Sequence, residues 1–291
     1  MTAFVLWLLQ RRYRLIILAI AVAPMIPLLS AALMTLETLR RGPNQGLLSA
    51  AFGLAGVLVL GGVVGTDLSV LAPVGGLTML SGTALGSIIG WTQSLTLAFQ
   101  ASLLVCVLGV VAALFVWPDP GALIGPRLDS LLAVLEGNGA SPEQLEALAQ
   151  LGGVFFGLLA AAIFAQVVVA AILGYWWASL AGTEGQPGSD FRSLRLGKLL
   201  GIPATLLMAS SLLLSTPVVQ NLFPVALFGF CFQGLAVTHA WAHAKRWNPA
   251  ILLLVYLLLV SPLTAVMILV LGSMGLTDNW INLRAPLRPV A

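Results

Sequence analysis

Long uncharged apolar runs make up most of the chain. They cover residues 15–36, 42–66, 68–118, 147–183, 199–244 and 247–277. A helix needs about 20 apolar residues to cross the hydrocarbon core of a membrane. The runs 68–118 and 199–244 are therefore each long enough for two helices and a turn. The pattern predicts eight membrane spans, near 15–36, 47–65, 68–89, 95–117, 151–178, 199–216, 222–241 and 250–272.

The runs are continuous and do not alternate between apolar and polar positions, as the strands of a membrane β-barrel would. We therefore expect an all-α fold, a polytopic transmembrane helix bundle of about eight spans. Bending of the first segment would raise the number to nine. We expect residues 1–291 to form a single transmembrane domain.

The first run has two interpretations. Arg11, Arg12 and Arg14 precede it, Arg40 and Arg41 follow it, and prolines occupy 24 and 27. As a single span it distributes positive charge evenly between the two sides. As a hairpin that returns to its starting side, it places ten of the 13 lysines and arginines on the cytoplasmic side, as short loops prefer. We favour the hairpin, with the amino terminus cytoplasmic. The hairpin would consist of residues 15–39, which reach about 37 Å, too short for two crossings, so it must be re-entrant and buried in protein.

Two polar segments interrupt the apolar runs. Residues 118–150 are predicted to form an extramembrane loop of two short helices separated at 137–139, the second beginning with Ser141 as N-cap and Pro142 in the first turn. A solvated cap and a lid over a pocket are the alternatives for this loop. Residues 182–198 are predicted to be a cytoplasmic linker that ends in a short amphipathic stretch at the membrane surface.

Composition excludes several classes of protein. Only 8% of residues are charged and 59% are hydrophobic, far from a soluble or disordered chain. The basic residues lie near span ends and form no groove for nucleic acid. Two isolated cysteines and the absence of an intramembrane catalytic motif indicate no enzyme, no cofactor and no metal. We expect a multi-pass protein of the bacterial cell inner membrane, in contact with the lipid bilayer.

Small residues repeat every four positions on several predicted helices. Gly82, Gly86 and Gly90 form one such face, and Ala19 and Ala23 form another. Faces of this kind let helices approach closely. Packing inside the bundle and docking of another membrane subunit are the two alternatives.

Ionisable groups at membrane depth are costly and are therefore candidates for function. Glu37 and His239 are the main candidates, although Glu37 lies four residues before Arg41 and is placed to pair with it. Asp67 follows a predicted span end, where the role of a helix N-cap is favoured.

Uncharged polar groups add a second kind of candidate. The stretch 221–239 contains the amides Asn221 and Gln233 among four phenylalanines, a composition typical of small-molecule sites. A packed helix is the alternative. Substrate-binding candidates are thus Glu37, Asn221, Gln233 and His239. His239 and His243 have metal-ligand spacing, but no carboxylate or cysteine nearby completes a set.

Three motifs are similar to those of a known family. They are Thr35–Gly42 followed by Gln45–Leu48, then Phe232–His239, then Leu271–Arg284. In this order they resemble the YybS-like family of uncharacterised bacterial membrane proteins. That family is in turn similar to the S components of energy-coupling-factor transporters. The resemblance implies capture of a small solute and docking on a membrane coupling subunit driven by ATPases, with Ala19 and Ala23 as the counterpart of the docking face. S components usually have six spans.

Two functions follow from these observations. The first is a small-solute-binding transporter component, similar to an S component, that works with partner subunits. The second is a membrane scaffold or interaction protein with no ligand site of its own. The chain contains no GxxxxGK[ST] motif, so an ATP-driven step would belong to another chain.

Overall fold

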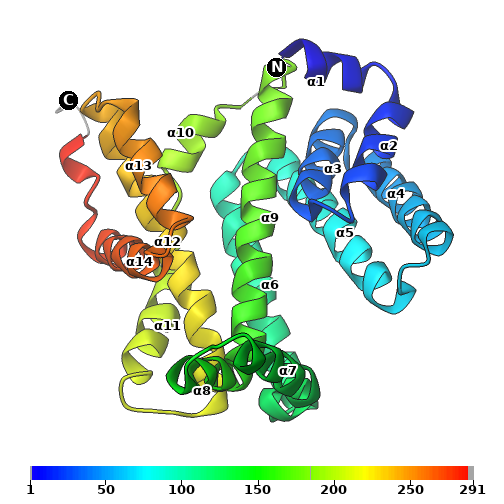
Figure 1. The fold of residues 1–291 in the computed structure, drawn as a ribbon. Coiled ribbons are helices and arrows are strands. Elements are labelled where there is room, and N and C mark those ends of the chain that lie inside the picture. Colours follow the sequence, from blue (N-terminus) through cyan, green and yellow to red (C-terminus); the bar gives the residue numbers. More distant parts are fainter. Residues whose placement is uncertain (1, 184, 288–291) are drawn as a thin grey trace. The chain divides into compact units, whose positions relative to one another are not determined.

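The computed structural model describes residues 2–183 and 185–287, and all regular secondary structure within them is helical (Figure 1). This confirms the predicted all-α class. The α-helices are α1 (Thr2–Leu9), α2 (Arg12–Val22), α3 (Pro27–Arg41), α4 (Pro43–Val64), α5 (Leu68–Thr92), α6 (Leu95–Val116), α7 (Pro120–Gly137), α8 (Pro142–Gln150), α9 (Phe155–Leu180), α10 (Pro187–Arg192), α11 (Gly197–Ser210), α12 (Pro217–Ala244), α13 (Pro249–Leu259) and α14 (Thr264–Ile281). Short 3-10 turns are formed by Leu151–Val154 (η1) and Ala285–Leu287 (η2).

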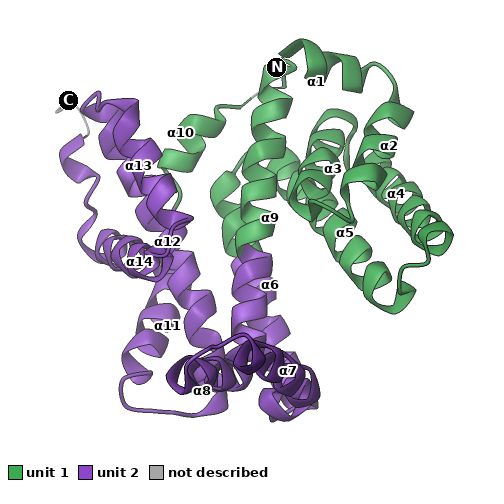
Figure 2. Cartoon of the chain, viewed as in Figure 1, with its two compact units in different colours: residues 1–102, 165–194 green, residues 103–164, 195–291 purple. Residues whose placement is uncertain are grey.

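Contacts divide the chain into two compact units (Figure 2). Unit 1 contains residues 1–102 and 165–194, and unit 2 contains residues 103–164 and 195–291. Helices α6 and α9 are each divided between the two units. The single transmembrane domain expected from the sequence stays a prediction.

Six helices in the described residues are long and apolar enough to cross a membrane. They are α4, α5, α6, the stretch Pro142–Leu180 that includes α9, α12 and α14. This pattern is that of a multi-pass membrane protein. The expected number of about eight spans is not confirmed.

Two of the eight predicted spans, 15–36 and 199–216, have no counterpart among these six, and a third, 250–272, is broken but overlaps α14. The run 15–36 is interrupted between α2 and α3, where Pro24 and Pro27 lie. The run 250–272 is interrupted between α13 and α14, next to Pro262. Helix α11 has only 14 residues, about 21 Å at 1.5 Å per residue, less than the roughly 30 Å hydrocarbon core. Proline ends helices because it lacks the backbone donor and clashes with the preceding turn.

The first apolar segment of unit 1 folds back on itself. Arg12, at the start of α2, lies 3.5 Å from the carboxylate of Glu37, near the end of α3. The two ends of the segment therefore meet, as in the hairpin that the charge distribution favoured. Helices α2 and α3 have 11 and 15 residues, or about 17 and 23 Å, so neither crosses the core alone.

Helix α3 is the buried centre of unit 1. Every residue from Ser30 to Thr38 is buried. Four of the five small residues singled out by the sequence are buried in this packing, and Gly90 is exposed. A Cβ on Gly82 would lie 2.2 Å from the Ala31 carbonyl oxygen, and one on Gly86 would lie 3.0 Å from that of Thr35. Gly90 faces Leu39 less closely, at 3.7 Å.

Ala19 of α2 and Ala23, the residue directly after α2, are buried in the apolar core of unit 1, together with residues of α3, α4 and α5. Helices of the same unit thus cover both small-residue faces. Gly90 is the exception, because it is exposed, and the choice between packing and docking stays a prediction.

A glycine crossing that the sequence analysis did not single out joins α12 and α14 in unit 2. A Cβ on Gly234 would lie 1.9 Å from the Leu271 carbonyl oxygen, and one on Gly275 would lie 1.9 Å from that of Phe230. The two backbones are therefore in direct contact. In unit 1 a Cβ on Gly174 of α9 would lie 2.5 Å from the Ala32 carbonyl oxygen, so these two backbones are also close.

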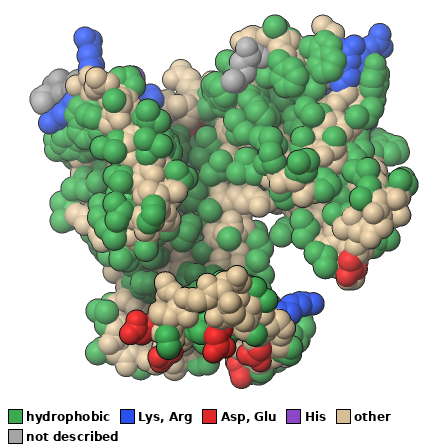
Figure 3. Space-filling model, viewed as in Figure 1, with side chains coloured by type: hydrophobic (Ala, Val, Ile, Leu, Met, Phe, Trp, Pro, Cys, Tyr) green, Lys and Arg blue, Asp and Glu red, His purple; other side chains and the backbone are tan. Residues whose placement is uncertain are grey.

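The polar loop 118–150 forms the two predicted short helices, α7 and α8. The side chain of Ser141 accepts from Gln144 N, and the Gln144 side chain accepts from Ser141 N, which completes a capping box. The predicted start of this helix is confirmed. On the face shown in Figure 3, most of the acidic side chains gather over α7 and α8, and apolar side chains cover much of the rest.

The linker 182–198 is less exposed than the sequence suggested. Its described part contains the short helix α10, and the side chains of Leu194 and Leu196 are buried in the protein. The apolar positions of the expected surface stretch therefore pack against the protein.

We expect Gly82→Ala to destabilise unit 1 by about 1–3 kcal/mol, because its methyl group would meet the backbone of α3. The matched control is Gly62→Ala on α4, where nothing lies within 4 Å of the new Cβ. This control should be neutral or stabilising, since alanine favours helix by about 1 kcal/mol over glycine. Thermal unfolding of the two purified variants measures the difference; equal melting temperatures would contradict the close approach of α3 and α5.

Candidate functional site

A cavity of about 400 Å³ lies in unit 2, between α6, α11 and α12. Its lining side chains are apolar throughout: Leu103, Leu104, Val107, Leu200, Pro203, Ala204, Leu207, Leu222 and Ala226. Small-molecule sites are commonly apolar clefts of this size with a few polar groups to fix orientation. This one has the apolar walls without the polar groups, so shape and volume would govern what it accepts.

Helix α11 forms one wall of the cavity with residues that are three or four positions apart in the sequence. Leu200, Ala204 and Leu207 lie on one face of the helix and line the cavity. A neighbouring face packs on α14, where a Cβ on Gly201 would lie 2.2 Å from the side chain of Asn279. In the same contact the indole of Trp280 donates to Thr205 Oγ1 at 3.2 Å. The remaining face is apolar and exposed.

Two residues have special backbone properties in α11. Gly197, at its start, has a φ of +71°, a backbone conformation that side-chain-bearing residues rarely adopt. Pro203, inside the helix, donates no backbone hydrogen bond and lies on the cavity wall. The helix is thus fixed by its contacts with α14 on one side and borders open volume on the other.

The cavity suits an apolar solute. Burying a polar group without a hydrogen bond is unfavourable, and a charge more so. A cavity of about 150 Å³ holds a benzene molecule. The observed volume therefore matches about two or three rings of that size, or the tail of an amphipathic molecule.

Glu37, a predicted substrate-binding residue, is fully buried in unit 1. Arg41 pairs with one carboxylate oxygen at 3.1 Å, and the Ser49 hydroxyl donates to the other at 3.1 Å. Arg12 lies 3.5 Å from the second oxygen and donates to Ser49 Oγ and to the side chain of Gln45. These contacts join α2, α3 and α4. The i, i+4 pairing expected from the sequence is present.

Asn221 is also buried, and it joins two segments of unit 2. Its Oδ1 accepts from Gly157 N at 2.9 Å, and its Nδ2 donates to the carbonyls of Gly153 and Pro217 at 2.8 and 2.9 Å. A Cβ on Gly157 would lie only 2.0 Å from the Asn221 carbonyl oxygen, so the absence of a side chain there makes the contact possible.

Gln233 belongs to a buried network at the crossing of α12 and α14. Its Oε1 accepts from Leu196 N at 2.9 Å, and its Nε2 donates to Asp278 at 2.8 Å. Arg284 donates to both oxygens of Asp278, at 2.6 and 3.2 Å. Gln233 can be recognised from the sequence, but the ion pair between Asp278 and Arg284 cannot. Asp278 directly follows an apolar run, where a charged residue indicates the end of a span. Helix α14 continues three residues beyond it.

A solute would have to displace these internal bonds to reach Glu37, Asn221 or Gln233. The geometry explains each residue as a tie between helices, and a role in substrate binding stays a prediction for all three. None of them lines the cavity described above.

His239 is partly exposed and lies near the end of α12. Its Nε2 is 2.8 Å from the hydroxyl of Tyr256 on α13, and the two rings meet edge to face. The described residues place no group of three metal-ligating side chains together. The contact holds α13 against α12.

Asp67 caps α5, as the sequence favoured. Its carboxylate accepts from Ser69 N at 2.8 Å, in the turn between α4 and α5. The hydrogen bonds from the side chain and backbone of Ser69 lower the pKa of Asp67. Its exposed position explains why this charge needs no buried partner.

We expect Asp278→Asn to lower the free energy of unfolding by about 3 kcal/mol, because it leaves a buried guanidinium without its counter-charge. Removing both charges, in Asp278→Asn/Arg284→Gln, should restore part of the loss. Thermal unfolding in detergent measures both.

Asp67→Asn is the control for this experiment. It removes a carboxylate that is exposed and whose capping role asparagine can take over, so its effect on the melting temperature should be small. A loss as small for Asp278→Asn would show that the ion pair is not a structural tie.

Comparison of the chain with protein-family models, with curated proteins and with solved structures gives no match.

Proposed function

We propose that this chain is the solute-binding component of a membrane transport system and that its solute is an apolar molecule, or the apolar part of an amphipathic one. The observation that carries the proposal is the cavity between α6, α11 and α12 with its entirely apolar lining. Membrane-embedded proteins with a site of this kind take up solutes that partition into the bilayer.

The surroundings of the cavity support access from the lipid. Leu104 lines the cavity and is itself exposed, and Leu206 on α11 is exposed beside it. Helix α11 is too short to close off the full thickness of the hydrocarbon core. An apolar solute dissolved in the bilayer would therefore reach the cavity without crossing water.

The transport step is proposed to depend on partner proteins. The chain has no phosphate-binding motif of the GxxxxGK[ST] type, so a membrane coupling subunit and ATPases would supply the energy. In this proposal the protein resides in the bacterial inner membrane with its amino terminus cytoplasmic, as the positive-inside distribution favours.

The alternative of a scaffold without a ligand site has less support. It relied on small-residue faces being available for docking, and Gly82, Gly86, Ala19 and Ala23 are covered by helices of their own unit. It would regain support if protein partners co-purify and no apolar compound binds.

We expect the purified protein to be stabilised by apolar probes such as naphthalene or farnesol and not by water-soluble vitamins. A ligand present at a hundred times its dissociation constant stabilises the folded state by about 2.7 kcal/mol. The rise in melting temperature on adding each probe is the measurement.

Ala204→Phe fills the cavity from α11 and should abolish this rise. The matched control, Ala209→Phe, adds the same ring at an exposed position of the same helix that does not line the cavity. Stabilisation by vitamins alone, or equal stabilisation of both variants by naphthalene, would show that the cavity is not the site.

A further inference from the structure

Helix α1 is apolar on all sides yet much too short to cross a membrane. Its eight residues extend about 12 Å. Val5 and Leu8 face inward and are buried in the core of unit 1. A helix of this length is placed either inside a protein or along the membrane interface, and only one face of α1 is inside.

The other face of α1 is a solvent-accessible apolar surface. Phe4, Leu6 and Trp7 are 53%, 45% and 47% exposed, and the rings of Phe4 and Trp7 stack at 6.1 Å. Tryptophan and phenylalanine with one side buried and one side accessible are typical of the boundary between lipid headgroups and acyl chains.

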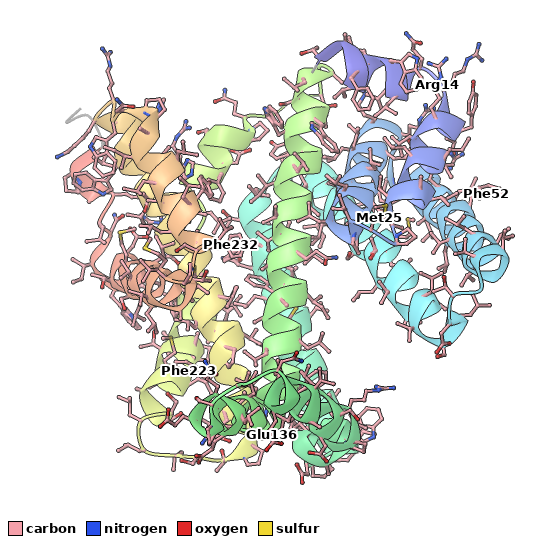
Figure 4. The ribbon with its side chains drawn as sticks, viewed as in Figure 1. Arg14, Met25, Phe52, Glu136, Phe223 and Phe232 are labelled. Atoms are coloured by element: carbon pink, nitrogen blue, oxygen red, sulfur yellow. The ribbon has the colours of Figure 1, made fainter. Side chains whose placement is uncertain are left out.

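Positive charge adjoins this apolar face. The guanidinium of Arg14 lies 4.5 Å from the centroid of the Trp7 ring and donates to the Trp7 carbonyl at 2.9 Å, and Figure 4 shows Arg14 at the start of α2, close to α1. Arg11, between the two helices, is exposed. Glu37, the nearby carboxylate, is fully buried and paired with Arg41. In the part of the chain that the structure describes, neither Arg11 nor Arg14 forms an ion pair, so their positive charge is uncompensated there.

Two arginines hold α1 in this position. Arg14 and Arg41 donate to the carbonyls of Trp7 and Leu9, which end the helix without further intrahelical partners. These hydrogen bonds fix the position of the apolar face relative to the arginines in the protein without a ligand.

We propose that the α1 surface, defined as Phe4, Leu6, Trp7, Arg11 and Arg14, is a binding site for anionic phospholipid. The aromatic and aliphatic side chains insert at the level of the acyl chains nearest the headgroups, and the two guanidinium groups bind the headgroup phosphate. An anionic lipid satisfies both halves of the surface, whereas a soluble acidic protein would leave the apolar half to be covered by something else. This inference is independent of the cavity in unit 2.

The first experiment titrates phosphatidylglycerol or phosphatidylcholine into the protein in detergent and counts bound lipid by native mass spectrometry. Phosphatidylglycerol should bind more tightly. Arg11→Gln should weaken its binding about fivefold, the change expected for one charge near an anionic surface, and Arg11→Gln/Arg14→Gln should weaken it further. Within the described residues the Arg11 side chain forms no hydrogen bond, so Arg11→Gln should not change the stability of the fold.

The matched control is Arg127→Gln, which removes an exposed arginine of α7 outside the α1 surface. It should leave phosphatidylglycerol affinity within twofold of the native value. Equal affinity of the native protein, Arg11→Gln and Arg11→Gln/Arg14→Gln would overturn the proposal, as would equal affinity for the two lipids.

The second experiment tests insertion in lipid vesicles that contain phosphatidylglycerol. A fluorophore is attached at Phe4→Cys or, as a reference within a predicted span, at Phe52→Cys on α4; the native cysteines are buried and should not compete for label. Brominated acyl chains should quench both fluorophores. Quenching at 52 without quenching at 4 would overturn the proposal and indicate that water or a protein partner covers α1.

Discussion

Helices that end inside the hydrocarbon core must have their polar groups satisfied by the protein, because lipid offers no hydrogen bonds. This constraint acts at each place where the chain departs from a simple series of spans. The α2–α3 hairpin is closed by Glu37 with Arg12 and Arg41, and the segment before α11 is held by Gln233 through Leu196 N. In the described residues every buried side-chain nitrogen and oxygen has a hydrogen-bond partner. The buried charged and amide residues therefore stabilise the fold by bonding to one another and to the backbone, without a ligand.

Close backbone contact supplies the second requirement of such a fold. Between helices in lipid there is little hydrophobic driving force, so packing and hydrogen bonds must hold them together. Gly82 brings α5 against α3, and Gly234 with Gly275 brings α12 against α14. At both crossings a polar tie accompanies the contact. The hydroxyl of Thr35 donates to the Gly82 carbonyl at 3.0 Å, and Gln233 donates to Asp278.

The sequence predicted those features that depend on local pattern. Apolar runs predicted the helical class, and the Ser141-Pro142 pair predicted the start of α8, because both signals lie within a few residues of the element. The number of spans was less predictable, since hydropathy measures the length of an apolar run and not where a helix in it breaks. Pro24 and Pro27 indicated a bend, but a bend and a helix end look alike in a sequence.

The site was predictable only in part, for a different reason. The sequence identifies polar residues at membrane depth, and Glu37, Asn221 and Gln233 were found in this way. It does not show whether their bonds point inward to the protein or outward to a ligand. The cavity had no polar residue to mark it, and Leu200 or Ala204 in an apolar run is indistinguishable from a lipid-facing position until α6, α11 and α12 are placed together.

The apolar character of the cavity follows from the same constraint as the polar ties. In unit 2 the buried amides Asn221 and Gln233 lie near the start and in the middle of α12, and Asp278 lies near the end of α14. Helix α11 lies between these ties and contributes leucine, alanine and proline to the cavity. A site in this position has no polar group with which to recognise a ligand, so it would select by volume and shape. One methylene group in an apolar pocket changes binding by about 1–3 kcal/mol, which makes selection among related apolar solutes possible but not strict.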